Sequence, residues 1–130
     1  SVMARNLYRL GILLDHEDWK QLATSMISKL SSIAESEPGY MSHWAILYAE
    51  IAKGMAEVVI VGNDAEKMRK ELHSHYLPFV LTLGTITKSN LPLFEGRESK
   101  DNKTRIYVCF NKTCKLPVER VEDALHQLRS

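Results

Sequence analysis

The sequence lacks the features that mark secreted and membrane-spanning proteins. Two cysteines among 130 residues cannot build the disulfide framework that holds a small secreted domain together. No apolar run approaches the roughly 20 residues needed to cross a bilayer. The first residues, 1 to 6, have no basic stretch followed by an apolar core, so they do not form a secretory signal. We therefore expect a cytoplasmic protein with no membrane partner.

The sequence also lacks an excess of charge of either sign. Seventeen Lys and Arg residues balance 16 Asp and Glu residues, giving a net charge of +1. The basic residues are scattered along the chain, which argues against a nucleic-acid partner held by bulk electrostatics. A hydrophobic content of 45% and a charged content of 25% are those of an ordinary globular protein.

Apolar spacing in the first half of the chain predicts three helices. The first carries Met3, Leu7, Leu10 and Leu14 at helical intervals, and a second stripe runs without a break from Trp19 to Ile33. Residues 38 and 39, Pro-Gly, separate these from a third helix. In that helix we expect the following residues to point inward: Met41, Trp44, Ala45, Tyr48, Ile51 and Ala52.

The apolar period changes in the second half. A β-branched run at 58–61, ended by Gly62, predicts a central buried strand, and Asn63 with Glu66 resembles a capping box that opens a helix. Further strands are expected at 79–86 and 105–110, separated by a polar surface loop at 88–103 and followed by a last helix. The predicted fold class is α/β: N-terminal helices packed with a small three-stranded sheet that contains a βαβ unit, and a C-terminal helix.

The most specific motif is Tyr-Val-Cys-Phe-Asn-Lys-Thr-Cys-Lys-Leu-Pro-Val at 107–118. It resembles the C-terminal end of the YyaL-type thioredoxin-domain-containing proteins, a family that includes the spermatogenesis-associated thioredoxin-like proteins of animals. Segments 3–7, 38–44 and 57–62 also resemble this family, so the resemblance spans essentially the whole chain.

The resemblance implies a parent protein with a thioredoxin-like domain, then a helical barrel similar to those of sugar epimerases and six-hairpin glycosidases, then a small α/β segment. Residues 1–54 would be the end of the barrel and residues 55–130 the α/β segment. We expect the chain to be a C-terminal fragment, because it opens without an initiator methionine inside a helical pattern. The Cys-x-x-Cys site of a thioredoxin-like domain is absent from it.

Cys109 and Cys114 are the candidate redox residues, and three interpretations of them remain open. The first is that both are buried structural cysteines, the second that they form a reversible disulfide, and the third that they belong to a metal site. We expect Cys109 to be buried and inert, with Cys114 more accessible. Zinc would need two further ligands, and the nearest histidines, His73 and His75, would point apart on a helix.

The remaining candidate residues are His43 and Trp44, which could line a sugar pocket in an intact barrel. Residues 62–64 could hold an anion at a helix N-terminus, although they lack a nucleotide-binding glycine pattern. The sequence contains no recognisable nucleophile–base pair, metal cluster or cofactor motif, so we expect no catalytic, cofactor-binding or metal residues.

Three functions are compatible with these patterns. The chain is a structural C-terminal module of an uncharacterised thioredoxin-domain-containing protein; or part of a carbohydrate-active barrel enzyme, contributing to substrate binding; or a small redox or interaction module using Cys109 and Cys114. The expected partner is the rest of the parent chain. Because its helices carry apolar residues on two sides, the isolated chain is expected to self-associate.

Overall fold

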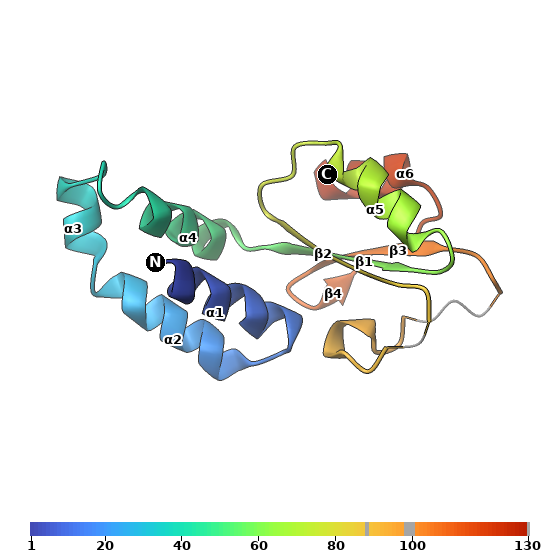
Figure 1. Cartoon of the computed structure of the whole chain (residues 1–130), viewed down its shortest axis with the longest axis horizontal. Helices are drawn as coiled ribbons and strands as arrows, with labels where there is room; N and C mark the ends of the chain where they lie inside the picture. The colour runs from blue at the N-terminus through green and yellow to red at the C-terminus, as the bar shows by residue number, and fades with distance from the viewer. Residues whose placement is uncertain (88, 98–100, 130) are drawn as a thin grey trace. The chain divides into compact units, whose positions relative to one another are not determined.

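The computed structural model describes residues 1–87, 89–97 and 101–129. It has a mixed α/β fold, as predicted, and divides into two compact units, Ser1–Gly54 and Met55–Ser130 (Figure 1). The first unit is helical. The second contains a four-stranded mixed sheet with helices.

Four helices, not three, make up the helical unit: α1 (Val2–Leu13), α2 (Glu17–Ser28), α3 (Ser31–Ser36) and α4 (Ser42–Lys53). The uninterrupted helix that the apolar stripe predicted from Trp19 to Ile33 is broken between α2 and α3. Serine hydroxyls account for the break, since Ser28 and Ser31 donate to the carbonyls of Ser25 and Ser28 at 2.9 and 3.1 Å. Such local bonds compete with the helical ladder.

Helices α1 and α2 cross closely at Gly11. A Cβ atom at this position would lie 2.6 Å from Cγ of Lys20, so only glycine permits the approach. The buried side of α1 is formed by Ala4, Tyr8 and Gly11. Met3 and Leu10 of the apolar stripe are exposed, in line with the apolar surface expected on this helix. Ala4 and Gly11 are small, so the backbones of α1 and α2 can approach each other on this side of α1.

Helix α4 also differs from the prediction. Its fully buried positions are Leu47 and Glu50, whereas Tyr48 is 62% exposed and Ala45 is exposed as well. The inward-facing set expected from hydrophobicity was therefore wrong for Tyr48, Ala45 and Ala52, which are all exposed. The apolar residues occur nearly all around this helix, so their pattern does not define one buried face. In the folded chain the buried face includes Glu50, which accepts hydrogen bonds from Arg5 and Arg9 of α1.

The α/β unit keeps the predicted order of three strands and two helices, with a 3-10 helix and a short fourth strand added, so the sheet has four strands where three were expected. Its elements are β1 (Ala56–Val61), α5 (Ala65–His73), β2 (Val80–Thr85), the 3-10 helix η1 (Pro92–Phe94), β3 (Arg105–Phe110), β4 (Thr113–Cys114) and α6 (Val121–Arg129). The strand order is β2-β1-β3-β4. Strand β1 is central, parallel to β2 and antiparallel to β3, which confirms the predicted βαβ unit.

The two faces of the sheet are sorted by strand alternation. Val58 and Ile60 on β1 lie opposite Val108 and Ile106 on β3, and these four residues form one core with α5 and α6. Both helices lie on this same side of the sheet (Figure 1). Cys109 belongs to the opposite face, because successive strand residues alternate.

Two details of the connections depart from the prediction. Asp64 is the N-cap of α5 and makes no side-chain cap bond; its backbone N–H donates to Thr104 Oγ1 at 3.0 Å, and Glu66 pairs with Arg69. The capping box is therefore not formed.

In the predicted surface loop 88–103, residues 88 and 98–100 lie outside the described part. Within the described part, η1 buries Leu93 and Phe94, so this segment contributes to the core.

Candidate functional site

The terminal motif folds into a hairpin that the sequence patterns did not predict. Strands β3 and β4 are joined by Asn111 and Lys112, whose φ angles are +48° and +66°. Positive φ at both central residues defines a two-residue type I′ turn, the connection that matches the twist of neighbouring strands. The usual signal for this turn is Asn-Gly. Here Lys stands in place of Gly, which hid the hairpin from sequence analysis.

The hairpin places Cys109 and Cys114 directly opposite each other, and a disulfide joins them. The next pair along is closed by a hydrogen bond from Lys115 N–H to the Val108 carbonyl at 2.8 Å. The cysteines thus occupy the alternate, non-hydrogen-bonded position, where facing side chains approach most closely. The predicted burial of Cys109 is confirmed, but the disulfide replaces the expected inert thiol.

The two sulfurs have different surroundings. Cys109 is 0% exposed, whereas Cys114 is exposed, as expected. Nη2 of Arg97 lies 2.8 Å from Sγ of Cys114. The second terminal nitrogen of the guanidinium, Nη1, donates to the carbonyl of Leu93, and the backbone N–H of Arg97 donates to the carbonyl of Phe94 at 3.0 Å. The short helix η1 therefore holds a cation against the exposed sulfur.

A carboxyl group occupies the other side of the disulfide. Glu57 on β1 lies opposite Cys109 on β3, and its side chain is on the same face of the sheet. Glu57 is only 5% exposed. The row across the sheet is therefore Leu81, Glu57, Cys109 and Cys114. Neither Glu57 nor Arg97 was predicted from the sequence as a site residue. A single Glu at the start of a run of valines was the available signal for Glu57.

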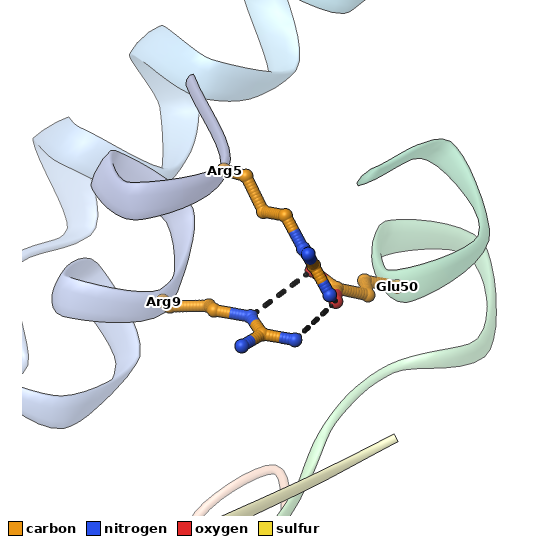
Figure 2. Close-up of polar contacts among 3 residues, drawn as sticks. All are labelled: Arg5, Arg9 and Glu50. Atoms are coloured by element: carbon orange, nitrogen blue, oxygen red, sulfur yellow. Dashed lines mark hydrogen bonds and ion pairs between the residues drawn. The ribbon is translucent and has the colours of Figure 1, made fainter. Parts of the chain in front are cut away.

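A second polar cluster lies in the helical unit. Glu50 of α4 is 1% exposed and accepts hydrogen bonds from Arg5 and Arg9 of α1 (Figure 2). Arg5 donates from Nε at 2.9 Å and from Nη2 at 2.7 Å, and Arg9 donates from Nη2 at 2.5 Å, all to Oε1. Burial alone would raise the pKa of Glu50, but these hydrogen bonds and the two positive charges lower it below its usual value.

The same carboxylate acts on Tyr8. Burial raises the pKa of Tyr8, and the negative charges of Glu50 and Glu17 raise it further. The cluster holds α1 to α4 through two cations and one anion. It is an ion-pair network within the helical unit, and none of its members was predicted from the sequence as a site residue.

His43 and Trp44 lie in the first turn of α4; His43 is exposed and Trp44 is half-buried. A cavity of about 480 Å³ in the helical unit is lined by Tyr8, Glu17, Lys20, Gln21, Thr24, Ser25 and Ser28. Neither of the predicted pocket residues lines it. Among the described residues, no three His, Cys, Asp or Glu side chains gather closely enough to hold a metal ion. No described helix has the length and apolarity to cross a membrane.

Comparison with known proteins finds distant relatives. Over 98% of its length the chain is 24% identical to spermatogenesis-associated protein 20 of Rattus norvegicus, and equally to spermatogenesis-associated protein 20 of Mus musculus. The chain spans 18% of the length of these relatives. No protein-family model matches it, and no solved structure matches it. The similarity along nearly the whole chain indicates a distant relation to these proteins.

Proposed function

We propose that this chain is a structural C-terminal module of a larger cytoplasmic protein related to spermatogenesis-associated protein 20. In this proposal the helical unit, 1–54, is the end of a helical barrel, and the α/β unit, 55–130, closes the chain. Its partner is the rest of the parent chain, and the module supplies no catalytic site for the parent. The share of the relatives that aligns with this chain, 18% of their length, supports a longer parent.

The observation that carries the proposal is the exposure of apolar side chains on α1 and α4. Val2, Met3 and Leu10 of α1 are 61, 66 and 43% exposed, and Ile46 and Tyr48 of α4 are 42 and 62% exposed. Folded monomers seldom leave large apolar groups grouped on the surface unless they bind something. Further helices of the same polypeptide would cover these groups.

The first experiment measures the size of the native protein. An antibody raised against this chain should detect a polypeptide several times heavier than 14.8 kDa in lysates of the source cells. A band at the mass of the chain alone would contradict the proposal.

The second experiment asks whether the exposed groups are covered in the parent. Replacing Tyr48 by Gln should change the melting temperature of the isolated chain little at concentrations where it is monomeric, because the ring is already exposed there. In the intact parent it should cost about 1–3 kcal/mol, since a packed aromatic ring is lost. Tyr76→Gln is the matched control: Tyr76 lies beyond the end of α5 and is 89% exposed. Equal effects of the two substitutions on the melting temperature of the parent would argue against a covering barrel.

A further inference from the structure

We propose that the Cys109–Cys114 disulfide is a reversible thiol–disulfide exchange site for a partner that carries two neighbouring thiols. Cys114 is the sulfur that the partner attacks, Arg97 stabilises the Cys114 thiolate, and Glu57 exchanges a proton with Cys109. The sequence resemblance assigns no role to Arg97 or Glu57; the site follows from the positions of these four residues in the α/β unit.

Accessibility decides which sulfur reacts. An incoming thiolate must approach one sulfur of the disulfide directly. Cys109 on β3 is fully buried, while Cys114 at the end of β4 is exposed. The Cys114 sulfur is therefore the entry point, and the buried sulfur is the leaving group in the first step.

Arg97 supplies the charge that a reactive cysteine needs. Thiolates are favoured next to cations, and the Arg97 guanidinium lies 2.8 Å from Sγ of Cys114. It is held there by its hydrogen bond to the Leu93 carbonyl. Lys115, the residue after Cys114, is directed elsewhere, since its Nζ donates to the Gln127 carbonyl at 2.9 Å and lies over the Phe110 ring.

Glu57 supplies the proton that the buried sulfur needs. A thiolate left in an apolar interior is costly, so Cys109 must be protonated as it leaves. Glu57 lies directly opposite it on the neighbouring strand, at the separation where cross-strand side chains interact.

The exchange balances in two steps. In the first, a partner thiolate bonds to Cys114 Sγ, the Cys109–Cys114 bond breaks, and Cys109 takes the electron pair together with the proton of Glu57. In the second, the partner's other thiolate attacks its own first sulfur, and Cys114 leaves as a thiolate beside Arg97. The partner is oxidised to a disulfide, and this chain gains two electrons. In the reverse direction the Glu57 carboxylate accepts the proton of Cys109.

The first test uses dithiothreitol as the dithiol. The folded chain is equilibrated with mixtures of reduced and oxidised dithiothreitol, quenched with acid, and its free thiols are alkylated and counted by mass spectrometry. We expect a reversible transition while circular dichroism shows a folded protein throughout. A disulfide that resists excess dithiothreitol until the protein unfolds would overturn the proposal.

The second test identifies the attacking sulfur and the role of Arg97. In the reduced protein, iodoacetamide should alkylate Cys114 before Cys109. Arg97→Gln should slow this alkylation at neutral pH by about three- to tenfold and move the rate profile to higher pH, whereas Arg97→Lys should restore most of the rate. Preferential labelling of Cys109 would overturn the assignment of Cys114 as the attacked sulfur. A pH profile of the alkylation rate that is the same for Arg97→Gln and the wild type would overturn the role of Arg97.

The third test addresses Glu57. Glu57→Gln keeps the shape of the side chain but cannot exchange a proton. It should slow reduction by dithiothreitol by about tenfold or more while leaving alkylation of Cys114 in the reduced protein unchanged. The exposed Glu71→Gln, on α5, is the control. Equal reduction rates for Glu57→Gln and wild type would remove Glu57 from the site.

Discussion

Two nitrogens of Arg5 donate to one oxygen of Glu50, at 2.9 and 2.7 Å, although the residues are 45 positions apart in the sequence. This contact fixes α1 against α4. Because Glu50 is almost completely buried, its charge is tolerated only while the arginines remain in place.

Removing that charge should therefore destabilise the helical unit. Glu50→Gln leaves Arg5 and Arg9 without their anion but keeps the side-chain volume. We expect the free energy of unfolding to fall by about 1–3 kcal/mol, at the lower end of buried pairs because both arginines retain contact with water. Urea denaturation at neutral pH measures the difference. Glu37→Gln, an exposed change in the same unit, should be neutral.

Acid should also remove the stabilisation that the charge of Glu50 provides. The folded-state pKa of Glu50 lies below its usual value of 4.5, so the unfolded chain binds a proton more readily. The stabilisation is fully present above the unfolded pKa and is lost as pH falls through the lower, folded pKa. The stability difference between wild type and Glu50→Gln should shrink as pH falls from about 7 to about 3. A constant difference over that range would contradict the assignment.

Glu66 provides the control for that titration. Arg69 donates a hydrogen bond that lowers the pKa of Glu66, and this pair lies on the surface of α5. Exposed pairs contribute little to stability. Glu66→Gln should therefore show the same direction of pH dependence with a much smaller amplitude.

Gly62 should not tolerate a side chain. Its φ is +139°, and a Cβ atom would lie 2.5 Å from the Cα of Thr104. Gly62→Ala adds backbone strain and a steric clash, so we expect a loss of about 3 kcal/mol. Thermal unfolding of the purified variant tests this. Gly39→Ala, at a position with open space around it, is the matched control and should change the melting temperature little.

The isolated chain should self-associate through the exposed faces of α1 and α4. Sedimentation at increasing concentration should show dimers or larger species, because apolar side chains there lack a cover. Replacing Met3 and Leu10 together by Gln should shift the distribution toward monomer. A chain that stays monomeric at high concentration, with or without these changes, would contradict this expectation.

Strands β1, β2 and β3 and helices α5 and α6 could be predicted because their signals are local, whereas β4 and η1 were not predicted. The valine run of β1 and the apolar side of α6 each define one buried face. The helical unit was predicted less well, since α4 is apolar nearly all around and Gly11 and Ala4 contribute to packing through their small size. Periodicity of hydrophobic residues does not detect either effect.

The candidate site was visible in part. The motif drew attention to Cys109 and Cys114, but whether they pair depends on the turn between them, where Lys112 adopts a conformation usually reserved for glycine. Arg97 and Glu57 come from separate elements of the same unit, so only the folded chain brings them to the two ends of the disulfide. No spacing rule links residues 57, 97, 109 and 114.

The covalent ring closed by Cys109 and Cys114 is very small, with a sequence separation of 5. A disulfide stabilises a protein mainly by lowering the conformational entropy of the unfolded chain, and this effect grows with the number of residues that the disulfide encloses. For so short a ring the disulfide contributes about 2 kcal/mol to the free energy of unfolding. Much of this contribution stabilises the β3–β4 hairpin alone. Opening the ring would therefore free only a few residues, and the sheet around Val58 and Ile106 has its own apolar core to keep it ordered.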